Sequence, residues 1–235
     1  MTVDRTPLLE ALGVELPDEL LTVALTHRSF AYENGGLPTN ERLEFLGDAV
    51  LGLVITAEIF AKYPDRTEGE LAKLKSAVVN TQALAQIARE LTDDGLGSYL
   101  LLGRGELASG GAQKANLLAD GLESLLGATY TEHGHQVARD VILRLFGELL
   151  ETAANLGAGL DWKTSLQELS AARRIGVPSY ILTSTGPEHD KYFTARAVVN
   201  GEDYGEGGGR TKKEAEQQAA AAAYAALEAA PVEDA

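Results

Sequence analysis

Glu41, Glu44 and Asp48 recur at steps of three and four residues within a largely apolar stretch, residues 40–53. Such steps return to the same side of an α-helix, so the three carboxylates share one stripe. A helix that simply faces solvent would be expected to show polar neighbours on both sides of that stripe. The apolar neighbours favour a functional cluster over a solvated acidic face, which is the ordinary reading of such spacing when it occurs alone.

A second acidic pair, Asp120 and Glu123, lies three residues apart among the leucines of residues 117–126. Carboxylates crowded into a partly dehydrated space repel one another, so they either take up protons or bind a cation. Carboxylate oxygens suit Mg²⁺ or Mn²⁺. If the two acidic stripes face each other, they predict a divalent-metal site.

A zinc site is excluded by residue type. The chain has no cysteine and four histidines, and those histidines form no zinc-type constellation with the acids. The absence of cysteine also fits a reducing compartment.

Turn and cap residues divide the first half into helices. A first helix is predicted to end at Gly13, Asn40 is predicted to cap the acidic helix, and Thr67 with Glu70 to form a capping box. From that capping box we predict one helix over residues 68–92. Glycines between 103 and 111 then predict a flexible loop.

The last third of the chain is predicted to form a helix, three strands and a second helix. Residues 164–174 are predicted to be helical, residues 179–185 and 191–199 alternate as strands, and Asn200-Gly201 marks a tight hairpin. A short strand and an alanine-rich helix from Ala219 to Ala230 complete the pattern. The small, weakly patterned residues 151–160 predict an interdomain linker.

Charge and hydropathy limit the partners. The net charge is −15, of which residues 1–160 carry −11 and residues 161–230 carry −2. This balance argues against nonspecific adhesion to nucleic acid, although a local basic patch can still bind phosphates. The N-terminal residues lack a signal-peptide core, and no apolar run is long enough to span a membrane. We therefore expect a cytoplasmic protein.

Three motifs carry a family resemblance. LTHRSF, ERLEFLGDAVL and LADGLESLLGATY, in that order, resemble bacterial ribonuclease III, and the segment from DWKTSLQEL to RTKKEAEQQAA resembles the double-stranded RNA-binding domain that follows in that family. The resemblance implies an all-α N-terminal nuclease domain over residues 1–150, a linker over 151–160, and a small α+β domain (α-β-β-β-α) over 161–230.

The resemblance also implies roles for individual residues. It assigns the metal to Glu44, Asp48, Asp120 and Glu123, of which we expect Asp48 and Glu123 to be the least replaceable catalytic groups. Glu41 and Glu68 are expected to be supporting residues, although Glu68 can equally be an ordinary first-turn acid. Phe45 interrupts the acidic face and is expected to anchor a homodimer, with an ordinary core phenylalanine as the alternative.

In the second domain the resemblance implies contacts with A-form RNA, which exposes ribose hydroxyls across a shallow minor groove. Thr164 and Gln167 are expected at one minor groove and His189 at the next. The intervening phosphates are assigned to three basic residues, Arg210, Lys212 and Lys213, at the start of the last helix. Gln217 stands where relatives often carry lysine, which reduces the expected affinity.

The expected function is therefore a Mg²⁺-dependent endoribonuclease, with Mn²⁺ as a substitute, acting on double-stranded RNA. By resemblance, a homodimer cuts both strands and leaves 5′-phosphates and short 3′ overhangs, in the maturation of ribosomal RNA precursors and the processing of messages. Two alternatives stay open: a noncatalytic dimer that binds duplex RNA, and a metal-dependent hydrolase of small phosphate esters, which would leave the C-terminal domain without a role.

Overall fold

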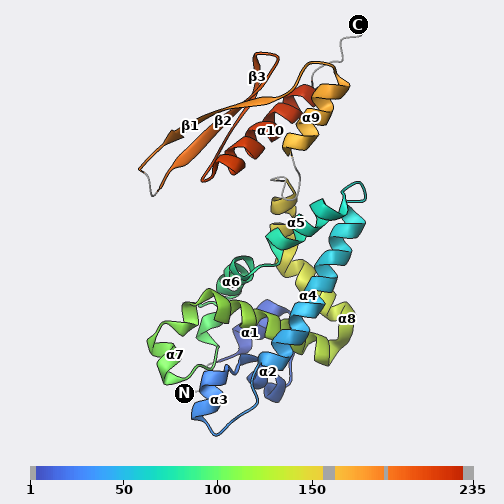
Figure 1. Ribbon diagram of the computed structural model, residues 1–235. Coiled ribbons are helices and arrows are strands. Elements are labelled where there is room, and N and C mark those ends of the chain that lie inside the picture. The colour runs from blue at the N-terminus through green and yellow to red at the C-terminus, as the bar shows by residue number, and fades with distance from the viewer. Residues whose placement is uncertain (1–3, 156–161, 188–189, 230–235) are drawn as a thin grey trace. The chain divides into compact units, whose positions relative to one another are not determined.

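A computed structural model describes residues 4–155, 162–187 and 190–229, and the chain divides into two compact units, Met1–Ala158 and Gly159–Ala235. The first unit is helical (Figure 1). Its α-helices are α1 (Thr6–Leu12), α2 (Asp18–Leu25), α3 (Arg28–Glu33), α4 (Glu41–Lys62), α5 (Glu68–Val78), α6 (Thr81–Glu90), α7 (Arg104–Ala108) and α8 (Ala115–Asn155), with short 3₁₀ turns η1 (Leu96–Ser98) and η2 (Gly111–Gln113). This confirms the predicted all-α domain.

The core of the first unit forms around α4 and α8, which pack against each other (Figure 1). Val50, Leu51, Val54, Ile55 and Ile59 form the buried face of α4. On α8, the leucines at 117, 118, 122, 125 and 126 are buried, at the spacing expected for one face of a helix. The acidic stripes predicted from the sequence therefore lie on two helices that share a core.

Several helix ends predicted from turn and cap residues are confirmed. Gly13, in the left-handed conformation at φ 66°, ends α1, and the Thr67–Glu70 capping box begins α5. The prediction of one helix over residues 68–92 is wrong, because the chain leaves helical geometry at Val79 and the Asn80 side chain accepts from the N–H groups of Gln82 and Ala83 to begin α6.

Three other local predictions also require correction. Asn40 precedes α4, but its side chain makes no capping hydrogen bond. The glycine-rich segment predicted as a loop contains α7 and η2, each ended by backbone hydrogen bonds. Finally, α8 continues to Asn155, so residues 151–155 of the predicted linker are helical.

The second unit has two helices on one face of a three-stranded antiparallel sheet (Figure 1). Its elements are α9 (Trp162–Ala172), β1 (Ser179–Thr185), β2 (Tyr192–Val199), β3 (Glu202–Gly209) and α10 (Lys212–Ala229), with strand order β1-β2-β3. The predicted α-β-β-β-α order is confirmed. So is the hairpin, in which Asn200 and Gly201 both have positive φ, at 51° and 85°.

Small residues let α10 lie directly on the sheet. Ala195 and Ala197 of β2 are fully buried, as are Ala219 and Ala223 of α10. A Cβ on Gly207 of β3 would lie 2.3 Å from the backbone nitrogen of Ala219, so only glycine fits there. The alanine-rich helix is therefore a packed element of this domain's core. Among the described residues, no helix of either unit is long and apolar enough to cross a membrane.

Candidate active site

Two glycines bring α4 and α8 into backbone contact. A Cβ on Gly47 would lie 1.8 Å from the carbonyl oxygen of Glu123, and one on Gly127 would lie 2.1 Å from that of Leu43. Contacts this close exclude any side chain larger than hydrogen at either position. The acidic stripe of α4 is thereby held against the acidic pair of α8.

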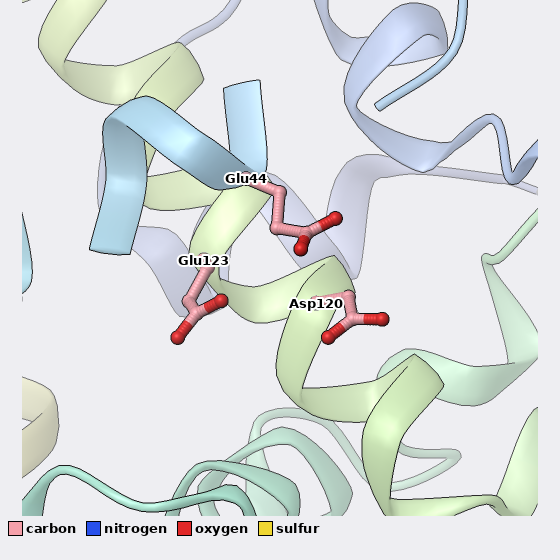
Figure 2. Close-up of side chains that lie close together, drawn as sticks. All are labelled: Glu44, Asp120 and Glu123. Carbon is pink, nitrogen blue, oxygen red and sulfur yellow. The ribbon is translucent and has the colours of Figure 1, made fainter. Parts of the chain in front are cut away.

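The crossing assembles a group of three carboxylates. Glu44 from α4 and Asp120 and Glu123 from α8 each offer an oxygen, and these oxygens lie within 4.8 Å of one another. Figure 2 shows the three side chains directed into a common space from the two helices. All three are half-buried, so solvent only partly screens their mutual repulsion.

Crowding changes the acidity of the group. Burial, followed by the charges of Asp48, Asp120 and Glu44, raises the pKa of Glu123 from 4.5 to about 7. Burial and the neighbouring acids also raise the pKa of Glu44. The pKa of Asp120 is raised by burial against the opposing effect of His27. Each carboxylate is thus costly to ionise without a positive charge nearby.

Asp48 and Glu41 lie at the edge of this group. Both are exposed, and Asp48 does not belong to the set of three oxygens. The charge of Asp48 nevertheless raises the pKa of both Glu44 and Glu123, and the charge of Glu41 raises that of Glu44. Of the four carboxylates predicted to share a metal, the structure therefore brings three together and leaves Asp48 beside them.

Glu68 and Phe45 do not join the three carboxylates. Glu68 is exposed and lines a different cavity of about 410 Å³ together with Phe60 and Lys75. Phe45 is 80% exposed, which excludes the ordinary core phenylalanine that was the alternative for this position.

A cavity of about 910 Å³ opens beside the carboxylates. Besides Glu41, Glu44 and Asp120, its lining residues include His27, Asn40, Lys114 and Asn116. Sequence reasoning gave these four no part in the site; the only signals were the position of His27 in the LTHRSF motif and of Asn40 at the start of the acidic helix. Lys114 is held by Glu106 at 2.6 Å and Ser109 at 2.9 Å.

The RNA contacts expected in the second unit are exposed wherever the structure describes them. Thr164 and Gln167 lie on α9, and the three basic residues lie at the start of α10, where Thr211 Oγ1 accepts from the Glu214 N–H at 3.1 Å. The Glu214 carboxylate in turn accepts from the Arg210 N–H at 2.9 Å. His189 lies outside the described residues.

A helical fold with a carboxylate cluster, followed by an α-β-β-β-α domain, can be compared with known proteins. A family model described as ribonuclease-III-like matches residues 17–149, and the double-stranded RNA binding motif matches residues 162–227. The chain belongs to the ribonuclease III family. Membership makes it, by class, an endoribonuclease and a hydrolase.

Curated ribonuclease III relatives match almost the whole chain. Ribonuclease 3 of Mycolicibacterium smegmatis is 68% identical over 97% of this chain and 99% of the relative. That of Mycobacterium tuberculosis strain H37Rv is 69% identical over 97% of this chain and 95% of the relative. A solved nuclease domain of Campylobacter jejuni ribonuclease III, described by its flexibility in a region involved in dimer formation, is 40% identical with a TM-score of 0.57, over 62% of this chain and 97% of that structure.

Proposed function

We propose that the chain is a divalent-metal-dependent endoribonuclease that cleaves double-stranded RNA, with Glu44, Asp48, Asp120 and Glu123 as its metal-binding carboxylates. The observation that carries this proposal is the convergence of three carboxylate oxygens within 4.8 Å at the crossing of α4 and α8.

The donor set fits a hard cation. All three groups offer oxygen, and their raised pKa values reflect repulsion that a bound divalent ion relieves. We infer Mg²⁺, with Mn²⁺ as a substitute, because both accept a few carboxylates and keep open positions for water and phosphate. When bound, such an ion supplies positive charge against the negative charge that develops on the phosphodiester.

The chain's own residues would do the remaining work. Glu44, Asp120 and Glu123, on two packed helices, would hold the metal ion whose positive charge offsets the negative charge of the scissile phosphate. Asp48, exposed beside them, is assigned to orient the attacking water together with Glu123. No covalent enzyme intermediate is required for such a hydrolysis.

We further propose that the chain acts as a homodimer through α4. Phe45, Leu53 and Phe60 are exposed by 80%, 59% and 72%, and their spacing places them on one stripe of that helix. An antiparallel pairing of two copies centred between Gly52 and Leu53 would set Phe45 of one copy opposite Phe60 of the other. Exposed aromatic side chains of this kind are frequent anchors of interfaces.

This pairing also offers Phe45 a receiving pocket. Phe60 lines the 410 Å³ cavity, together with Ile59, Leu71 and Lys75. Glu68 lines the same cavity, so seating Phe45 there would bring Glu68 of one copy towards Glu44 of the other. We therefore retain Glu68 as a supporting residue that acts across the dimer. Two sites on opposite strands would leave 5′-phosphates and short 3′ overhangs.

The second domain is proposed to supply affinity for duplex RNA. Thr164, Gln167 and His189 are assigned to the minor groove, and Arg210, Lys212 and Lys213 to phosphates near the start of α10, where the helix dipole favours anions. The proposed substrates are structured ribosomal RNA precursors and messages in the cytoplasm, as the family resemblance implies.

The test compares cleavage of a long RNA duplex, the matching DNA duplex and single-stranded RNA, with Mg²⁺, Mn²⁺ or a chelator. Only the RNA duplex with a metal ion is expected to give short products carrying 5′-phosphates. Asp48→Asn, Asp120→Asn and Glu123→Gln should bind the duplex without cutting it, while Glu132→Gln, an exposed acid on α8, should cut normally. Binding without cleavage by the unaltered chain in both metals would instead support the noncatalytic duplex-binding alternative.

A further inference from the structure

The cavity beside the carboxylates contains a buried amide for which the proposed chemistry has no use. Asn40 is only 4% exposed and lines this cavity. Within the residues that the structure describes, its side-chain oxygen and nitrogen make no hydrogen bond, and it does not cap α4. Among the described residues, neither of its side-chain atoms is a fully buried polar atom without a partner, so both reach the cavity, where a ligand can replace the water that would otherwise bind them.

The backbone holds Asn40 in place. Its N–H donates to the carbonyl oxygen of Thr26 at 2.9 Å, and its own carbonyl oxygen accepts from the Glu44 N–H at 2.9 Å. The amide is therefore fixed between the residue that precedes His27 and the first of the three clustered carboxylates.

His27 offers a second polar group on the same cavity wall. Its Nδ1 accepts from the Ser29 N–H at 3.2 Å and lies 2.7 Å from Ser29 Oγ. Because Ser29 Oγ itself accepts from the Gly103 N–H at 2.9 Å, its hydroxyl proton is free to point to His27 Nδ1.

These contacts select one tautomer. With Nδ1 accepting twice, the neutral ring carries its proton on Nε2. Burial lowers the pKa of His27, ahead of the opposing charge of Glu106, which favours that neutral ring. Nε2–H thus remains as a hydrogen-bond donor that has no partner among the described residues.

The charge of the cavity decides what this pair can bind. Five acids line it, Glu33, Glu41, Glu44, Glu106 and Asp120, against two basic residues, Arg28 and Lys114, so an extra phosphate on this wall would meet a net negative charge. A ribose hydroxyl is neutral and both donates and accepts a proton. The amide of Asn40 can accept from and donate to such a group, and His27 Nε2–H can donate to it.

We propose that Asn40 and His27 bind the 2′-hydroxyl of a ribose next to the scissile phosphate and so select RNA over DNA within the nuclease domain. This inference rests on the proposed function, because it assumes that an RNA strand lies across the three carboxylates.

The test measures single-turnover cleavage of an RNA duplex with one cleavage site, and of duplexes with a single 2′-deoxy substitution at each nucleotide flanking that site. At one position the unaltered protein should cut the deoxy duplex about 3- to 10-fold more slowly, as expected for one neutral hydrogen bond. Asn40→Leu, of similar volume, should cut both duplexes at the same reduced rate. His27→Asn, which can still cap α3 but lacks Nε2–H, should likewise show a smaller difference.

A matched control is Asn34→Leu, the same change at an exposed asparagine outside the cavity lining, and it should keep full discrimination. If both cavity variants discriminate as strongly as the unaltered protein, or if the unaltered protein discriminates at no position, the inference is overturned. If Asn40→Leu does not fold, the His27→Asn result decides. Failure of the unaltered protein to cut the all-RNA duplex would overturn the proposed function itself.

Discussion

A Cβ on Gly47 would lie 1.8 Å from the carbonyl oxygen of Glu123, so the backbones of α4 and α8 touch one turn away from Glu44. The distance between the carboxylates of the two helices depends on this contact. No side chain at residue 47 can be accommodated unless the helices separate.

Gly47→Ala should therefore move Glu44 away from Asp120 and Glu123. We expect a loss of about 1–3 kcal/mol in the free energy of unfolding, from overpacking, together with loss of the stabilisation by Mg²⁺ and of cleavage. Thermal unfolding with and without Mg²⁺ measures the first two effects, and cleavage of an RNA duplex measures the third. Gly147→Ala, on α8 with open space around its Cβ position, is the control and should be neutral or slightly stabilising.

Without metal, stability should fall as the pH rises from about 4.5 to about 7. The pKa of Glu123 is raised from 4.5 to about 7, so the folded state holds a proton that the unfolded state has already released. The stabilisation is present below pH 4.5 and lost above 7, and amounts to roughly 1–2 kcal/mol after solvent screening.

Chemical denaturation at pH 5 and pH 8, in the presence of a chelator, measures this pH dependence. Glu123→Gln should flatten it, whereas Glu132→Gln should leave it intact. An equal slope in Glu123→Gln and the unaltered protein would contradict the assignment to Glu123.

Phe45→Ala should weaken self-association without unfolding the chain, because the side chain is 80% exposed. An interface anchor contributes about 2 kcal/mol or more, and a symmetric dimer contains Phe45 twice, so the dimer dissociation constant should rise at least roughly 30-fold. Sedimentation equilibrium measures it. Leu107→Ala, at a leucine that is 52% exposed on α7, is the control, and equal effects of the two changes would argue against the α4 interface.

Lys212→Ala and Lys213→Ala should each weaken duplex binding regardless of sequence, because both residues are assigned to phosphates. Each change should reduce the slope of log affinity against log salt concentration by about one. Titrations at several salt concentrations measure this slope, with Lys73→Ala on α5 as the control. An unchanged slope in both variants would show that these lysines do not contact the RNA phosphates.

Helix ends and turns were largely predictable from the residues close to them in the chain. The Thr67–Glu70 capping box, the end of α1 at Gly13 and the Asn200-Gly201 hairpin depend on groups close together in the chain, and all three are confirmed. The hydrophobic pattern continues on both sides of Asn80, so periodicity alone does not predict the break there, although asparagine is a preferred N-cap residue.

The sequence alone determined that acids would share stripes on two apolar helices, since helical periodicity depends only on spacing. Tertiary structure decided which acids meet. Gly47 and Gly127 fix where α4 crosses α8, and that crossing gathers Glu44 with Asp120 and Glu123 while Asp48 stays exposed. It also decided that Asn40 is buried in the cavity wall, because its backbone pairs with Thr26. Periodicity specifies the face of a helix, whereas the distance between two helices depends on packing contacts far apart in the chain.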